Sequence, residues 1–204
     1  MYRELRSAAR PGEAEDVVAA FGGAGDALVA GDLDRATELL VWAKSAAARS
    51  SVIREALGVV RYHAGDFPGA HSELLAYRRL SGRQDQNHLL ADCARAAGRP
   101  EKVVEYVGAM DGDTVPADRV AEGILVLAGD RADRGDTQGA LRALERADLA
   151  PTDVQDYHVR LWYLAADLSE RLGDREAARD YLDAISAVEP DYLDAAERLE
   201  ALDR

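Results

Sequence analysis

Apolar residues recur along this chain at spacings of three and four, which is the period of an amphipathic helix. Five glycines interrupt the pattern, in the pairs Gly31-Asp32, Gly65-Asp66, Gly98-Arg99, Gly135-Asp136 and Gly173-Asp174. These glycines are 34, 33, 37 and 38 residues apart. Glycine accepts the left-handed backbone that ends a helix, and an aspartate after it can accept hydrogen bonds from the free amides of the next helix. The pattern predicts five helical hairpins, each turning at one glycine.

Alignment of the five units on these glycines shows which other positions repeat. Seven residues before the glycine, where two helices should cross closely, every residue is small: Ala24, Gly58, Ala91, Ala128 and Ala166. Five, nine and twelve residues after it the residues are apolar, in the sets Ala36, Leu40 and Ala43; Ala70, Leu74 and Tyr77; Val103, Val107 and Met110; Ala140, Leu144 and Ala147; and Ala178, Leu182 and Ile185. One buried stripe per second helix is therefore expected, with Leu74 in the core.

These repeated positions resemble the tetratricopeptide repeat (TPR), whose signature places W-x2-L-G-x2-Y in a first helix and A-x3-F in a second, followed by P. The fifth unit supplies Trp162, Ala166, Ala178, Leu182 and Pro190, and the second unit supplies Leu57-Gly58, Ala70 and Leu74. The resemblance implies an all-α, right-handed superhelical solenoid of about five TPR-like hairpins plus a C-terminal capping helix.

A second resemblance covers most of the chain. The stretches Arg54-Glu55-Ala56, Tyr62-His63-Ala64-Gly65, Arg78-Arg79, Ala91-Asp92-Cys93 and Gly98-Arg99-Pro100-Glu101 are similar to an actinobacterial family of cytoplasmic TPR proteins. That family has no established biochemical role, so this resemblance implies a compartment and a fold class and names no partner.

The pattern indicates a single solenoid domain over residues 1–204. A short N-terminal helix lies within 1–12, the five hairpins occupy 13–188, and an amphipathic capping helix spans 191–204 with Leu193, Ala196, Leu199 and Leu202 on its apolar face. Gly22, Gly23 and Gly25 each disfavour helix by ~1 kcal/mol relative to alanine, which predicts an irregular first helix. Trp42 and Trp162 are expected to pack in the core.

Charge and cysteine usage narrow the class of partner. The 204 residues hold 25 Lys and Arg against 38 Asp and Glu, a formal charge of −13, so nucleic acid and anionic membrane are not expected as partners. The single cysteine, Cys93, cannot form an intramolecular disulfide, and a reducing cytoplasm is the simplest compartment. The apolar stretch Gly123–Gly129 is far shorter than the ~20 residues that a membrane span needs.

The TPR resemblance implies a concave groove lined by the first helix of each hairpin. Transferred position by position, its candidate peptide-binding residues are Glu55, Val59, Tyr62, His63, Asp85, His88, Asp92, Arg95, Tyr163 and Asp167. An acidic groove with an apolar mouth fits a protein or peptide partner that carries basic and hydrophobic residues. We therefore expect a non-catalytic scaffold or adaptor; the other interpretation of these acids is a merely solvated groove lining.

Two further interpretations involve chemistry. His63, His88, Asp92 and Cys93 could approach one another as metal ligands, and Glu55 with Tyr62 could form an acid–base pair. Polar groove contacts and packing account for both sets more simply, with Cys93 directed into the hairpin core, because no metal-ligand motif, nucleophile or phosphate loop accompanies them. The sequence predicts no enzyme, cofactor or metal. An accessory or self-assembling subunit, and thus a homo-oligomer, remains the alternative, ahead of a metal-binding or enzymatic protein.

Overall fold

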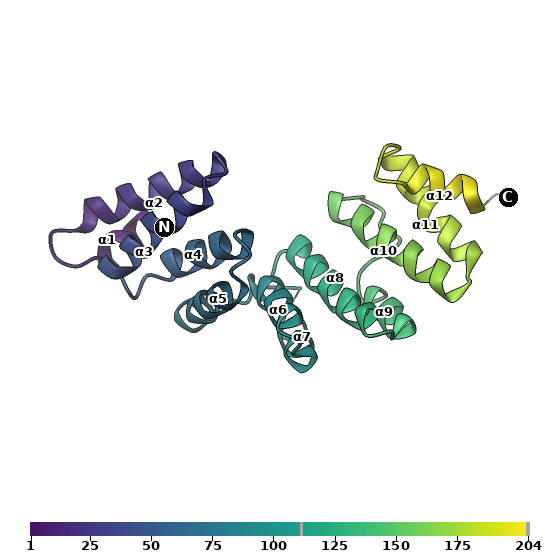
Figure 1. Cartoon of the computed structure of the whole chain (residues 1–204), viewed down its shortest axis with the longest axis horizontal. Coiled ribbons are helices and arrows are strands. Elements are labelled where there is room, and N and C mark those ends of the chain that lie inside the picture. Colours follow the sequence, from purple (N-terminus) through teal and green to yellow (C-terminus); the bar gives the residue numbers. More distant parts are fainter. Residues whose placement is uncertain (111, 203–204) are drawn as a thin grey trace. The chain divides into compact units, whose positions relative to one another are not determined.

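The structure is a computed structural model that describes residues 1–110 and 112–202. In that part of the chain all regular structure is helical, with twelve helices and no strand (Figure 1). The chain divides into two compact units, Met1–Arg99, the N-terminal unit, and Pro100–Arg204, the C-terminal unit. The single domain over 1–204 stays a prediction. Within the described residues no helix combines the length and apolarity that a membrane span needs.

The N-terminal unit contains the short first helix, two complete hairpins and the first helix of the third. Its helices are α1 (Tyr2–Ala8), α2 (Ala14–Val29), α3 (Leu33–Ala46), α4 (Ser51–His63), α5 (Phe67–Ser81) and α6 (Asn87–Ala96). Hairpins α2–α3 and α4–α5 turn at Gly31 and Gly65, as the spacing predicts. The short helix α1 ends before Pro11-Gly12, and its Leu5 is fully buried against residues of α2, α3 and α4.

The C-terminal unit contains the second helix of the third hairpin, two complete hairpins and the capping helix. Its helices are α7 (Pro100–Gly108), α8 (Ala117–Asp133), α9 (Thr137–Leu144), α10 (Asp156–Leu172), α11 (Arg175–Val188) and α12 (Ala195–Leu202). The order of helices is the one that five hairpins and a cap require, with the unit boundary between α6 and α7.

The turns behave as the sequence predicts. All five repeat glycines have positive φ, between 65° and 81°, which is the left-handed backbone that favours glycine. The aspartates that follow four of them cap the next helix, since Asp32, Asp66, Asp136 and Asp174 each accept a hydrogen bond of 2.9–3.0 Å from the amide three residues on. Local chemistry therefore fixes where these hairpins turn.

The repeated stripe is buried, with two exceptions. The residues five and nine positions after each glycine are at most 2% exposed. Met110 and Ala147, both predicted at the third stripe position, are only half-buried. The reason is helix length: α7 ends at Gly108 and α9 ends at Leu144, so neither helix carries the stripe that far.

Two predictions about individual helices are wrong. Helix α2 is continuous through Gly22, Gly23 and Gly25, because Val17, Ala20 and Ala24 bury one face and tertiary packing outweighs propensity. The cap also presents a different face: Ala195 is buried and Leu199 and Leu202 are half-buried, whereas Leu193 and Ala196 are exposed. Leu193 precedes α12 and has a left-handed backbone, which shifts the helix and its apolar face. Residues 203–204 of the predicted cap lie outside the described residues.

The two tryptophans differ. Trp162 is 5% exposed and donates its indole N–H to the carbonyl oxygen of Leu149 at 2.8 Å, so its predicted core position is confirmed. Trp42 is 40% exposed, and the prediction that it packs in the core is wrong. Trp42 lies on α3 outside the buried stripe Ala36, Leu40 and Ala43.

Replacing Gly22 with alanine is expected to stabilise the N-terminal unit by about 1 kcal/mol, because glycine disfavours a helix interior and an added Cβ meets no atom within 4 Å. Urea unfolding followed by hydrogen exchange of α2 measures the change. Gly31→Ala is the matched control: its φ of +77° should make the same substitution destabilising. Destabilisation by Gly22→Ala would contradict the packing of α2.

Candidate functional site

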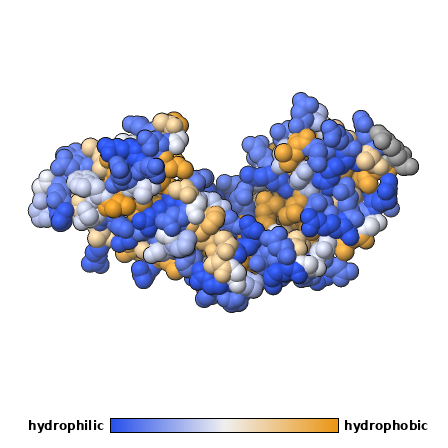
Figure 2. All heavy atoms as spheres, viewed as in Figure 1, coloured by the Kyte–Doolittle hydropathy of each residue, from blue (hydrophilic) through white to orange (hydrophobic). Residues whose placement is uncertain are grey.

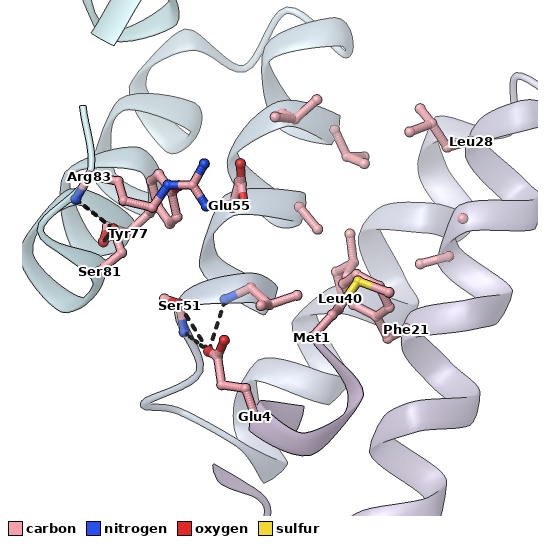
Figure 3. Close-up of a pocket in the computed structure, with 16 residues that line it drawn as sticks. Met1, Glu4, Phe21, Leu28, Leu40, Ser51, Glu55, Tyr77, Ser81 and Arg83 are labelled. Carbon is pink, nitrogen blue, oxygen red and sulfur yellow. Dashed lines mark hydrogen bonds between the residues drawn. The ribbon is translucent and has the colours of Figure 1, made fainter. Parts of the chain in front are cut away.

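An apolar pocket of about 560 Å³ opens in the N-terminal unit between α2 and α4 (Figure 3). Helix α2 contributes Phe21 and Leu28, and α4 contributes Val52 and Val59. The remaining lining residues are Met1, Glu4, Ala24, Gly25, Leu40, Ser51, Glu55, Ala56, Val60, Tyr77, Ser81 and Arg83. The first helices of hairpins one and two therefore form its walls, which is where the TPR resemblance places a groove. We call this space the apolar pocket.

Glu4 at the pocket rim joins α1 to the start of α4. Its Oε1 accepts hydrogen bonds from the amides of Ser51, at 2.7 Å, and Val52, at 3.2 Å, and from the Ser51 hydroxyl at 2.9 Å (Figure 3). Burial alone would raise the pKa of Glu4, but hydrogen bonds from Val52, Ser51 and Ser50 outweigh it and hold that pKa below the ordinary value. The carboxylate is ionised at neutral pH and, beside the N-cap residue Ser50, accepts hydrogen bonds from free amides in the first turn of α4.

Glu55 is the second carboxylate of the pocket. Its Oε1 accepts a hydrogen bond from the Gln86 side-chain amide at 2.8 Å, and it lies four residues after Ser51 on α4. Arg83, on the same side, forms an ion pair with Asp85. Among the described residues neither Glu4 nor Glu55 takes part in an ion pair, so the pocket presents two carboxylates whose partners within the chain are neutral.

The two units differ sharply in charge. Residues 1–99 hold 13 acidic residues (Asp and Glu) and 13 basic residues (Lys and Arg). Residues 100–204 hold 25 acidic and 12 basic residues. The whole formal charge of −13 therefore belongs to the C-terminal unit. On the face drawn in Figure 2 the surface is mostly hydrophilic, with separate apolar patches on each unit. The apolar pocket thus lies in an electrically neutral unit.

Tyr62, Asp92 and Arg95, three of the predicted groove residues, lie together and bind one another. The Tyr62 hydroxyl donates to Asp92 Oδ2 at 2.6 Å, and Arg95 Nε donates to Asp92 Oδ1 at 2.9 Å. Burial and the hydrogen bond to Asp92 raise the pKa of Tyr62 well above its ordinary value, so the hydroxyl stays protonated. The charge of Asp92 is therefore already compensated by the chain.

Asp85 and His88 are buried, at 8% and 5% exposed. Asp85 lies in the turn before α6, where its Oδ1 accepts the Tyr77 hydroxyl at 2.8 Å. His63 is exposed at the end of α4 and does not line the pocket. These residues do not form an open acidic wall: of the ten predicted groove residues, Glu55 and Val59 are the ones that line the apolar pocket.

The alternative metal site does not assemble in the described residues, where no group of three or more His, Cys, Asp and Glu side chains is placed to hold a metal ion. Cys93 is 2% exposed, which confirms its predicted direction into the core. Burial, with Asp92 beside it, raises the pKa of the Cys93 thiol to about 12. The thiol is thus protonated at neutral pH and is a poor ligand or nucleophile. The sequence also predicts a loop over 111–116 between the third and fourth hairpins, and its first residue, Asp111, lies outside the described residues.

In the C-terminal unit, the two predicted groove residues also have partners within the chain. Arg171 Nη2 lies 2.7 Å from Asp167 Oδ2. The Tyr163 hydroxyl donates to Asp194 Oδ1 at 2.7 Å, which places the segment before α12 against α10. Glu122, another acid on this unit, is ion-paired with Arg160.

Sequence reasoning missed Glu4 and Arg83, which lie outside the repeated positions, and also Glu73 in the core of the same unit. Glu73 is 3% exposed and occupies the position eight residues after a repeat glycine, where the other units have Leu39, Tyr106, Ala143 and Tyr181. A carboxylate at a position that is otherwise apolar was the signal available in the sequence. Glu4 and Arg83 carried no comparable signal.

No protein-family model and no curated protein matches this sequence. Solved structures do match. MamA superposes with a TM-score of 0.64 at 14% identity, over 90% of this chain and 95% of MamA. TTC0263, described as a thermophilic TPR protein in Thermus thermophilus, superposes with a TM-score of 0.61 at 17% identity, over 91% of this chain and 98% of TTC0263. YrrB, described as a TPR protein with an unusual peptide-binding site, superposes with a TM-score of 0.59 at 17% identity, over 91% of this chain and 93% of YrrB.

The superpositions show a shared fold, and at identities this low they show the fold alone. The chain therefore has the all-α, TPR-like helical-repeat fold that its sequence predicts. The resemblance to an actinobacterial family stays a prediction.

Proposed function

We propose that the protein is a non-catalytic peptide-binding scaffold whose N-terminal unit binds a partner segment in the apolar pocket. The partner carries bulky hydrophobic side chains next to lysine or arginine. One observation carries this proposal: an apolar cavity of about 560 Å³ in a neutral unit whose two lining carboxylates, Glu4 and Glu55, pair with no cation of the described chain.

The chemistry of the pocket determines the class of partner. Phe21, Leu28 and Val59 can bury an apolar side chain, which gives affinity in proportion to the area removed from water. Glu55 Oε2 is left to accept a charged hydrogen bond from a cation beside that side chain. Helices α2 and α4 provide a rigid frame, and YrrB, which shares the fold, is described as having a peptide-binding site.

Selection of a random phage-displayed peptide library on the full chain tests the proposal. We expect enriched peptides to place an aliphatic or aromatic residue within a few positions of lysine or arginine. Val59→Asp puts a charge in the pocket wall and should weaken each enriched peptide about tenfold or more, because burial of an unpaired charge costs at least about 1.4 kcal/mol. Glu55→Gln should weaken it about three- to fivefold, the range of one exposed ion pair.

Val41→Asp is the matched control. Val41 belongs to the same unit, is 40% exposed on α3 and does not line the pocket, so this variant should bind the selected peptides as the unchanged chain does. The proposal fails if no peptide is enriched, or if Val59→Asp and Val41→Asp bind the enriched peptides equally. The alternative of a self-assembling subunit stays a prediction, which the mass of the chain in solution at several concentrations tests.

A further inference from the structure

The C-terminal unit has its own candidate recognition face, on α10. It carries the predicted groove residues Tyr163 and Asp167, and the TPR resemblance also places Arg160, Glu170 and Arg171 at groove positions of this hairpin. Tyr163 and Glu170 are in contact with the segment that runs from Tyr192 into α12. Part of this face is therefore occupied by the chain itself.

Three side chains of that segment make specific contacts with α10. Arg198 faces both oxygens of Glu170, with Nη2 at 3.0 Å from Oε2 and Nε at 3.4 Å from Oε1, and its guanidinium lies 4.9 Å from the centre of the Tyr163 ring. Asp194 accepts the Tyr163 hydroxyl, and the Tyr192 ring meets Tyr163 edge-on at 5.5 Å. An aromatic residue, an acid two residues later and an arginine four residues after that form one binding pattern.

The segment is short, and one of its residues has a strained backbone. Helix α12 has eight residues, too few to be stable alone, and only Ala195 among them is fully buried. Leu193, at the junction with α11, is 70% exposed and has a φ of +47°, a left-handed backbone that disfavours residues other than glycine. Tyr192, Leu199 and Leu202 pack against the core of this unit, and Arg175 of α11 donates to the Leu202 carbonyl oxygen at 2.9 Å. The polar contacts of Asp194 and Arg198 add the specific attachment to α10.

Charge also opposes the attachment. Residues 189–202 include Glu189, Asp191, Asp194, Glu197 and Glu200 but a single cation, Arg198, and they belong to the unit that carries the whole formal charge of −13. A helix that made the same three contacts with basic residues at the outward positions would be attracted where this segment is repelled.

We propose that residues 192–202 are an internal, displaceable ligand of the α10 face, and that this face recognises a basic partner helix carrying the same aromatic, acidic and arginine side chains. This site belongs to the C-terminal unit and does not rest on the apolar pocket. Binding of such a helix releases α12 and leaves α10 and α11 folded.

A peptide derived from the segment tests the proposal. The probe is a fluorescein-labelled peptide with the sequence of residues 189–202 in which Glu197 and Glu200, both exposed, are replaced by lysine. Fluorescence anisotropy with the full chain should show saturable binding, and the same peptide with Arg198→Ala should bind about tenfold less well. In the chain, Arg198→Ala should strengthen binding of the probe about tenfold, because the internal ligand competes less.

Arg142→Ala is the control, since Arg142 is an exposed arginine on α9 of the same unit and lies outside the contacts that hold α12 to α10, and it should leave the affinity unchanged. Hydrogen exchange of the unmodified chain gives a second readout: saturating probe should remove protection from α12 amides and keep that of α11. Equal binding of the two peptides, an unchanged affinity in Arg198→Ala, or α12 protection that persists under saturating probe overturns the proposal. A doubled mass in solution with α12 protected assigns the face to a second copy, which also overturns it.

Discussion

Replacing Glu73 with alanine is expected to lower the free energy of unfolding of the N-terminal unit by about 3 kcal/mol at pH 7. Glu73 lies on α5 and is 3% exposed, yet it is charged. Its removal leaves cations from two other helices close together in a partly buried site without their counter-charge. Loss of one partner of a buried ion pair costs more than the pair contributes, because the remaining charge stays desolvated.

The contacts of Glu73 support this magnitude. Lys44 Nζ of α3 lies 2.7 Å from Oε1, Arg54 Nη1 of α4 lies 2.6 Å from Oε2, and Arg61 Nη1 of α4 lies 3.7 Å from Oε1. The three cations have side chains that are 23–25% exposed, so water screens them only in part. One carboxylate therefore joins three consecutive helices, and Glu73→Gln, which keeps the shape and removes the charge, should also be destabilising.

The effect should depend on pH. Burial alone would raise the pKa of Glu73, but the hydrogen bonds from Lys44 and Arg54 outweigh it and hold the pKa below the ordinary value. A carboxyl with a lowered pKa in the folded state stabilises the fold above its unfolded pKa, and this contribution is lost as the pH falls through the folded pKa. The difference between the unchanged chain and Glu73→Gln should therefore be full at pH 7 and should shrink below about pH 4.

Hydrogen exchange of α4 and α5 amides across a urea series measures these changes within the N-terminal unit. Glu38→Ala is the control: its ion pair with Arg35 is exposed on both sides, so the loss should be no more than about 1 kcal/mol. A loss as small for Glu73→Ala as for Glu38→Ala would show that the three cations are solvated rather than held by Glu73.

The hairpin turns could be predicted from sequence because their determinants are local. A glycine with a positive φ and the aspartate after it act within four residues, and Gly31-Asp32 and Gly65-Asp66 behave as expected. Helix α2 was mispredicted because the opposing determinant is not local: the burial of Val17 and Ala20 depends on residues of α1, α3 and α4. The apolar face of the cap was mispredicted because it depends on the left-handed backbone of Leu193. A leucine gives no indication in the sequence that its backbone is left-handed, as a glycine would.

The candidate site was predicted less well than the fold, for a related reason. Repeat positions identify which side chains a groove would contain, and two of these, Glu55 and Val59, line the apolar pocket in the structure. They do not identify the partners of those side chains. Asp92 accepts a hydrogen bond from Tyr62 of another helix and is ion-paired with Arg95, and Tyr163 is bound by Asp194 from a segment 31 residues away. Acidity counted along the sequence therefore overstated the charge that a ligand would meet.

The division of charge between the units joins the two proposals. The N-terminal unit is neutral and its apolar pocket binds a partner mainly by burying an apolar side chain, while Glu55 orients the cation beside that side chain. Binding to this unit should therefore depend only weakly on salt. The C-terminal unit, with all of the formal charge of −13, attracts cations over a longer range, so binding of a basic helix to α10 should weaken strongly as salt rises. Salt dependence thus distinguishes which unit holds a given partner.

Replacing Leu74 with alanine is expected to lower the free energy of unfolding of the N-terminal unit by about 2–5 kcal/mol, the range for a buried leucine that leaves a cavity. Leu74 is fully buried on α5 where it crosses α4. At that crossing a Cβ added to Gly58 would lie 2.7 Å from both Leu74 Cγ and Cδ2 and 3.3 Å from the Leu74 backbone nitrogen. Gly58→Ala should therefore also destabilise, by about 1–3 kcal/mol less the ~1 kcal/mol gained from helix propensity.

The effects of the two substitutions on the free energy of unfolding should be coupled, because Leu74→Ala removes the side chain that the added methyl group would meet and Gly58→Ala partly fills the cavity that Leu74→Ala leaves. In the double variant the Gly58→Ala methyl group enters space that the Leu74 side chain has left, so the two 2.7 Å clashes disappear and the cavity shrinks, while the 3.3 Å approach to the backbone nitrogen of residue 74 remains. We expect the double variant to be more stable than the sum of the single changes predicts by at least about 1 kcal/mol, measured by urea unfolding with hydrogen exchange of α4 and α5. Gly22→Ala combined with Leu74→Ala is the control and should be additive, since an added Cβ at Gly22 meets no atom within 4 Å. Additivity of Gly58→Ala with Leu74→Ala would mean that α4 and α5 do not cross at these residues, and the repeat register that places Gly58 opposite Leu74 would be wrong.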